Sequence, residues 1–252
     1  MAMDLSFYAV AAPAVVLLGL SKSGLSGLGA LAVPLMALSI PPIEAAAITL
    51  PIMVVQDWVG VYAFRREVDG RNLAILLPAA LIGVVLAFFL AAHVSEDMVR
   101  LAVGVVSVGF VALMVARDRL LAAHPAKAKV APGLFWGALA GFASFVSHAG
   151  GPPFLVYVMP QRLSTPVFAG TSVLFFAAVN LMKVPPYLLL GQFSRAHLLI
   201  SLTLLPLAIV STLAGVWIVR RVRPEKFYNA VLILTFGLGV KLIYDAVRPL
   251  IG

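Results

Sequence analysis

Two short polar segments interrupt long apolar stretches of this sequence. Residues 21–29 read Ser-Lys-Ser-Gly-Leu-Ser-Gly-Leu-Gly, and residues 147–153 read Ser-His-Ala-Gly-Gly-Pro-Pro. Glycine and proline break helices, and the N-terminus of a half-helix combines free N–H groups with a partial positive charge. With a lysine in the first break and a histidine in the second, this chemistry suits the binding of an anion between the two breaks.

Charged and titratable side chains in apolar surroundings are costly and usually functional. Lys22 in the first break is therefore expected to contact a substrate, the alternative being a side chain that extends to the membrane surface. His148 holds the matching place in the second break, where it could bind the anion, carry a coupled proton or form a core hydrogen bond. Asp57 is expected either to carry a proton or to form a structural charge pair with Lys183 or Lys241.

Amide and hydroxyl side chains add further candidates. Gln56 and Asn180 lie near the middle of two long apolar runs, where they either donate hydrogen bonds to an anion or join neighbouring helices. Thr171 and Ser172 are weaker candidates, because hydroxyls in membrane helices often bond their own backbone. The predicted coupling residues are Asp57 and His148, and the predicted substrate-binding residues are Lys22, Ser23, Gly24, Ser26, Gly27, Gln56, His148, Gly150, Gly151, Thr171 and Asn180.

The composition fixes the class of protein that must position these residues. Of the 252 residues, 62% are hydrophobic and 11% are charged. Soluble domains carry about 25% charged residues. The long unbroken apolar runs favour helices over the short alternating segments of a membrane barrel, so the fold class is an all-α polytopic membrane protein.

The apolar runs form two similar halves. With a shift of 124–128 residues, Gly24 falls on Gly150, Pro34 on Pro160 and Gln56 on Asn180. This similarity predicts an internal duplication in one transmembrane domain, with repeat 1 at about 5–116, a linker at about 117–131 and repeat 2 at about 132–248. Each repeat should hold a broken helix or hairpin plus three transmembrane helices, giving roughly 8–10 helical membrane segments in all.

Loop charges predict how the two repeats are oriented. If each break folds back as a hairpin or crosses twice, each repeat has an odd number of crossings and the repeats are inverted. The basic residues of 65–71, of the linker and of 220–226 then all lie on the cytoplasmic side, in agreement with the positive-inside rule. Both termini would be outside. The net charge of +8 is thus explained by topology, and no nucleic-acid partner is predicted.

The sequence resembles the TauE/SafE family of sulfite and organosulfonate exporters. The resemblance rests on the glycine-rich first break, on the second break with its Ser-His-x-Gly-Gly-Pro-Pro pattern, and on duplicated halves of four apolar runs in about 250 residues. It implies a transporter in the bacterial inner membrane that exports a small sulfur-containing anion by alternating access, with a different small anion as the alternative substrate. It predicts the lipid bilayer and a small anion as partners, with proton coupling left open.

An enzyme of a different class is the other alternative. Gly24-Leu25-Ser26-Gly27 matches the Gly-x-Ser-Gly of rhomboid intramembrane proteases, with His148 as the base. The motif precedes the rest of the chain, however, whereas rhomboids place their serine after a helix that bears the histidine. The chain has no cysteine and no Gly-x-x-x-x-Gly-Lys-[Ser/Thr] segment, so no cofactor, metal or ATP-driven pumping is predicted.

Overall fold

The computed structural model describes residues 5–23, 28–36, 39–90, 95–120 and 127–251, and within them the protein is helical throughout. The expected helical class is therefore confirmed. The elements are α1 (Leu5–Ser21), η1 (Leu28–Leu31), α2 (Ala32–Met36), α3 (Pro42–Phe64), α4 (Gly70–Leu90), α5 (Glu96–Leu120), α6 (Val130–Ser147), α7 (Gly151–Val158), η2 (Met159–Gln161), α8 (Thr165–Leu189), α9 (Arg195–Val219) and α10 (Pro224–Ile251).

Several of these helices are long and apolar enough to cross a bilayer. In the described part of the chain these spans are 44–64, 70–90, 165–189, 195–219 and 229–248. Large apolar side chains such as Phe89, Leu189 and Ile233 point outward and are more than two-thirds exposed. Because such surfaces are stable only against lipid, the protein is a multi-pass membrane protein.

Helix ends follow the local sequence. Pro42 opens α3, because a proline at the first helical position loses no intrahelical hydrogen bond. The hydroxyl of Ser194 accepts a hydrogen bond from the amide of His197 and caps α9. At the predicted linker, α5 continues to Leu120, four residues beyond the apolar run, because basic residues extend a helix readily once it leaves hydrocarbon.

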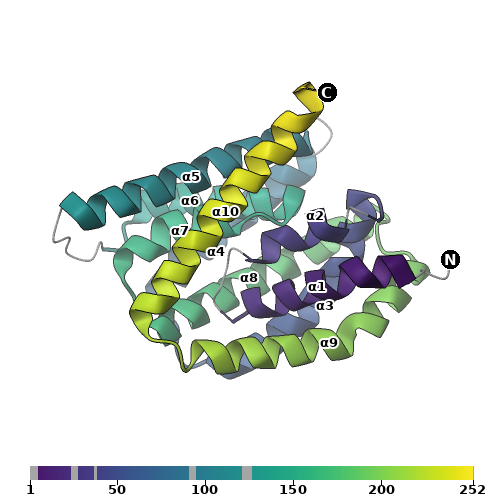
Figure 1. Cartoon of the computed structure of the whole chain (residues 1–252), viewed down its shortest axis with the longest axis horizontal. Coiled ribbons are helices and arrows are strands. Elements are labelled where there is room, and N and C mark those ends of the chain that lie inside the picture. Colours follow the sequence, from purple (N-terminus) through teal and green to yellow (C-terminus); the bar gives the residue numbers. More distant parts are fainter. Residues whose placement is uncertain (1–4, 24–27, 37–38, 91–94, 121–126, 252) are drawn as a thin grey trace.

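The helices that end at the two breaks each pack against a helix of the other half of the chain. α1 lies along α9, and α6 lies along α4 (Figure 1). Small residues allow close approach: a Cβ on Gly83 of α4 would lie 2.0 Å from the carbonyl oxygen of Ala138, and one on Gly141 of α6 would lie 2.2 Å from that of Ala80. Gly141 therefore allows close packing of α6 on α4.

α3 and α8 cross in the centre of the molecule, and α5 pairs with α10 beside them (Figure 1). Each of the two central helices carries polar residues in its middle, and these residues are buried. The crossing thus brings together side chains that are far apart in the sequence.

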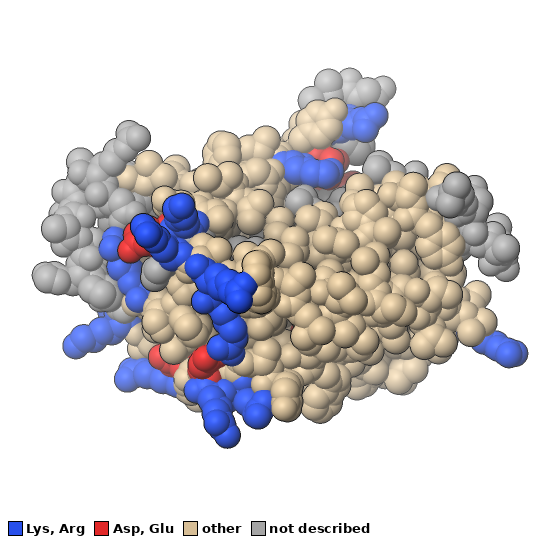
Figure 2. Space-filling model, turned by 60° about the horizontal axis from the view of Figure 1, so that its bottom comes forward, with Lys and Arg blue, Asp and Glu red and all other residues tan. Residues whose placement is uncertain are grey.

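Side-chain contacts define two ends of the molecule. At one end Arg220, after α9, forms an ion pair with Glu67, after α3, at 3.1 Å. At the opposite end of these two helices His197 lies 3.8 Å from Glu44. On the face seen in Figure 2, lysines and arginines gather toward one end and the rest is almost uncharged.

Candidate functional site

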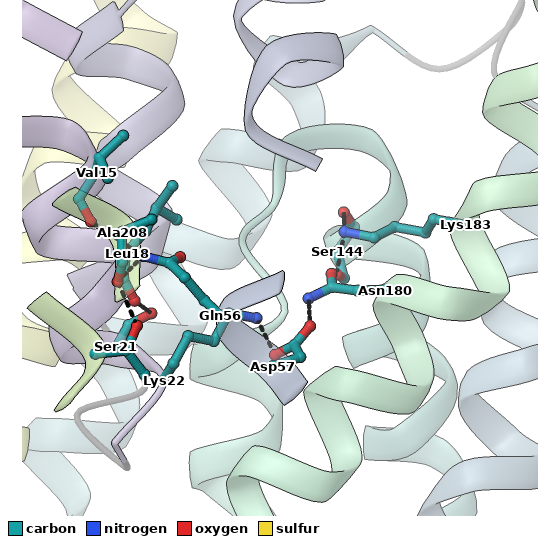
Figure 3. Close-up of polar contacts among 11 residues, drawn as sticks. Val15, Leu18, Ser21, Lys22, Gln56, Asp57, Ser144, Asn180, Lys183 and Ala208 are labelled. Carbon is teal, nitrogen blue, oxygen red and sulfur yellow. Dashed lines mark hydrogen bonds and ion pairs between the residues drawn. The ribbon is translucent and has the colours of Figure 1, made fainter. Parts of the chain in front are cut away.

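A buried ion pair joins the first break to the central helix crossing. The Nζ atom of Lys22 lies 2.6 Å from Oδ1 of Asp57, and Nδ2 of Asn180 donates a 2.7 Å hydrogen bond to Oδ2 of the same carboxylate (Figure 3). Lys22 follows α1, Asp57 lies in the middle of α3 and Asn180 lies in the middle of α8. The three side chains are at most 6% exposed. The carboxylate is thus held by a cation and an amide in surroundings of low dielectric, where such contacts are strong.

The two partners predicted for Asp57 are wrong. Lys241 forms its ion pair with Asp245, one turn away on α10, at 2.6 Å. Lys183 lies one turn beyond Asn180 on α8 and points toward α6 (Figure 3). Where α3 and α8 pack across each other, the carboxylate lies opposite Asn180, which donates a hydrogen bond to it.

Lys183 is 1% exposed and is bound by neutral acceptors. Its Nζ donates to the carbonyl oxygen of Ser144 at 3.3 Å and to Oγ of the same residue at 3.2 Å (Figure 3). Ser144 lies in the last turn of α6, at the negative end of the helix dipole. The ammonium group is thus placed beside the second break, and no carboxylate among the described residues forms an ion pair with it.

His148 ends α6 in a left-handed conformation. Its φ and ψ are 55° and 21°, and its amide donates to the carbonyl oxygen of Ser144 at 3.2 Å. The imidazole is 9% exposed, and neither ring nitrogen has a hydrogen-bond partner among the described residues. A buried polar group without a partner is costly and rare in folded proteins. Both ring nitrogens therefore have unused capacity for hydrogen bonding in this part of the structure.

A cavity lies between the two breaks. It encloses about 40 Å³, room for about three water molecules or one small anion. Its wall contains both polar and apolar side chains. It is lined by Leu18, Ser21, Lys22, Gly29, Met53, Ser144, His148, Gly151, Ser172, Val173, Phe176, Asn180 and Lys183.

Four predicted binding residues line this cavity: Lys22, His148, Gly151 and Asn180. The prediction of binding residues omitted Ser144 and Lys183, although both could have been found. Ser144 precedes His148 by one helical turn, and Lys183 follows Asn180 by nearly one turn, so each shares a helix face with a residue that was chosen.

Other predicted residues lie outside the cavity wall. Gln56 donates to the carbonyl oxygens of Val15 at 3.4 Å and Ala208 at 3.2 Å, and so joins three helices. Asp57, the predicted coupling residue, is not part of the cavity wall either and contacts it through its ion pair with Lys22 and its hydrogen bond with Asn180.

Two hydroxyls and one glycine of the predicted set also have structural contacts. Thr171 accepts a hydrogen bond from the amide of Asp69, and the hydroxyl of Ser23 donates to the carbonyl of Leu20. A Cβ on Gly150 would lie 2.6 Å from the carbonyl oxygen of Ala140, so this glycine allows the break to pack on α6. The predicted residues Gly24, Ser26 and Gly27 lie outside the described residues.

The second break offers fewer backbone donors than its glycines imply. Pro152 and Pro153 occupy the first turn of α7 and have no N–H, and the amide of Phe154 is bonded to the carbonyl oxygen of Gly150. Side chains therefore provide most of the hydrogen-bond donors at this break. Among the described residues there is no group of three or more His, Cys, Asp or Glu that could hold a metal ion.

Comparison with known proteins gives one match. The family described as "Sulfite exporter TauE/SafE" matches residues 11–242, which is nearly the whole chain. No curated protein and no solved structure matches. The matched region contains both breaks and the entire cavity wall.

Proposed function

We propose a specific transport function for this chain, which belongs to the sulfite exporter TauE/SafE family. Members of this family are membrane transporters, not enzymes. The alternative of a serine protease with Ser26 and His148 is therefore wrong. The proposed activity is the outward movement of a small sulfur-containing anion, sulfite or an organosulfonate, by secondary transport.

The observation that carries this proposal is the donor-rich wall of the cavity. Lys22, Lys183 and the hydroxyl of Ser144 surround it, and His148 brings an imidazole with no internal partner. Asp57, the acidic residue of this cluster, is already bound by Lys22 and Asn180. The cavity thus has many groups that can donate to an anion and few that would repel it.

Alternating access is supported by the way in which the two halves pack. α1 contacts α9 as α6 contacts α4, α5 pairs with α10, and α3 crosses α8. In the order of the chain, α1, α3, α4 and α5 of the first half correspond to α6, α8, α9 and α10 of the second half. Replacing each helix by its counterpart gives the same set of contacts. We infer inverted repeats in which the first break enters from one side of the membrane and the second from the other, so that rocking of one repeat against the other opens the cavity to each side in turn.

Loop charge supports an assignment of sides. Arg220 and Glu67 bring the 65–71 and 220–226 loops together, and most of the basic residues of these loops are exposed. We take this end as cytoplasmic. Both termini then lie outside a bacterial inner membrane, and in Figure 1 both ends of the described chain point toward the same end of the long axis.

The membrane potential is sufficient to drive the proposed export. Because the cytoplasm is negative, an expelled anion gains about 2.3 kcal/mol per charge per 100 mV. Proton coupling is a separate proposal, in which an entering anion takes Lys22 from Asp57, which then binds a proton, or in which His148 binds one. A proton carried outward with the anion would cancel its charge and remove the drive that the membrane potential provides. Both routes remain proposals.

A flux assay with purified protein in liposomes tests the function. Sulfite, sulfoacetate, taurine and thiosulfate are compared under an imposed potential, with and without a pH gradient. We expect at least one of them to move faster than in empty liposomes, and Lys183→Met to lower that rate about tenfold or more, since it removes a charged donor from the cavity.

Lys241→Met is the matched control, because Lys241 is an exposed lysine whose partner is Asp245, one turn away on α10. It should transport as the unmodified protein does. Rates equal to those of empty liposomes for all four anions would disprove the substrate class.

A further inference from the structure

The charges around the cavity can be counted. Lys22 and Asp57 form an ion pair at 2.6 Å and cancel, whereas among the described residues Lys183 donates to the neutral oxygens of Ser144. No described residue accepts a hydrogen bond from either ring nitrogen of His148, and two lysines are its neighbours in the cavity wall, so we count the imidazole as neutral. With Lys22, Lys183 and Asp57 all charged, the described side chains at the cavity carry one net positive charge.

Partial charges of the backbone do not alter this count. The C-terminus of α6 and the N-terminus of α7 meet at the same break, and their dipoles bring partial charges of opposite sign. Residues 24–27, which lie outside the described structure, are Gly-Leu-Ser-Gly and have no charged side chain.

A net charge of one sets a limit on the ligand. A buried charge that is not compensated is strongly unfavourable in surroundings of low dielectric. One monoanion brings the cavity to neutrality, whereas a dianion leaves one negative charge unpaired.

We propose that this site takes its substrate as a monoanion, that is, as a sulfonate or as bisulfite, and discriminates against dianions such as sulfate. The inference depends on the proposed transport function and specifies its substrate class.

The composition of the wall supports the same assignment. Lys22, Ser144 and Lys183 in the lining are polar, whereas Leu18, Val173 and Phe176 are apolar. A sulfonate has three oxygens for polar groups and one carbon substituent for apolar ones. Sulfate has a fourth oxygen that also needs a hydrogen-bond donor, and a polar group left unsatisfied costs binding energy.

Methanesulfonate and sulfate are the probes that test the proposal. They are similar in size and tetrahedral shape, but methanesulfonate has one negative charge and sulfate has two. Binding of each is measured by titration calorimetry on the purified full-length protein at neutral pH. We expect methanesulfonate to bind about tenfold or more tightly than sulfate, given the strength of a unit charge in this environment.

Charge variants make the test specific. Asp57→Asn raises the net charge of the site by one, so the preference should shift toward sulfate by about tenfold. The double variant Lys22→Met/Asp57→Asn returns the net charge of the site to its original value and should restore the preference for methanesulfonate. Asp245→Asn changes the charge of the whole protein equally but lies on α10 outside the cavity wall, and it should leave the ratio unchanged.

The outcomes separate this inference from the proposed function. If sulfate binds as tightly as methanesulfonate or more tightly, the assignment of a monoanionic substrate is overturned, but the cavity is still an anion-binding site. The same holds if Asp57→Asn and Asp245→Asn shift the ratio alike. If neither probe binds, the proposed function itself fails. Should Asp57→Asn not fold, the comparison in the unmodified protein still decides.

Discussion

The ammonium group of Lys22 lies 2.6 Å from the carboxylate of Asp57, and both side chains are buried. This contact fastens the end of α1, at the first break, to the middle of α3. A substrate anion that binds Lys22 must compete with it. We therefore expect an anion that binds Lys22 in the cavity to change the stability of the folded protein as well.

We predict that Lys22→Met destabilises the protein by about 3–5 kcal/mol, because it leaves a buried carboxylate without its cation. The double variant Lys22→Met/Asp57→Asn should recover most of this loss, since no charge remains unpaired. Unfolding of the purified protein in detergent measures both effects. If the double variant is no more stable than Lys22→Met, the ion pair does not account for the loss.

His148→Gly should fold at least as well as the unmodified protein and yet lose transport. The residue has φ 55°, a left-handed conformation that costs a non-glycine residue about 1–2 kcal/mol, so glycine relieves strain while removing the imidazole. The measurements are thermal unfolding and sulfite flux in liposomes.

Arg162→Gly is the control for this substitution. Arg162 has φ 51°, the same left-handed region, but is not part of the cavity wall. The Arg162→Gly variant should keep its flux. If His148→Gly also keeps its full flux, the imidazole has no part in transport.

Gly83→Ala should lower the free energy of unfolding by about 1–3 kcal/mol, because the new Cβ would lie 2.0 Å from the carbonyl oxygen of Ala138 and push α4 from α6. Gly109→Ala in α5 is the matched substitution, since a Cβ there meets no atom within 4 Å. It should be neutral or should stabilise α5 by about 0.5–1 kcal/mol. Equal effects of the two variants would contradict close packing at Gly83.

The absence of cysteine allows a direct test of topology. Single cysteines at Arg66 and Arg223 lie in the two basic loops, and single cysteines at Ser39 and Arg195 lie near the opposite ends of α3 and α9. In intact cells a thiol reagent that does not cross the membrane should label the second pair. The first pair should react only after the cells are permeabilised. Labelling of Arg66→Cys and Arg223→Cys from different sides would refute the inverted arrangement.

Part of the site is evident from residue types alone. Lysine, histidine and asparagine are costly inside apolar runs, so Lys22, His148 and Asn180 stand out in the sequence as candidates. Gln56 stands out for the same reason, but it faces Val15 and Ala208. A costly side chain indicates that it has a partner, and the sequence does not say whether this partner is a substrate or another helix.

The sequence by itself determined the membrane class, the helical spans and the position of both breaks, because hydropathy and helix-breaking residues act locally. Only the tertiary structure decided which groups meet. Asp57 pairs with Lys22 and Asn180, and not with Lys183, because of the way in which α3 and α8 pack across each other. That packing depends on residues far apart in the chain, and it decides which of the two lysines is left without a carboxylate partner.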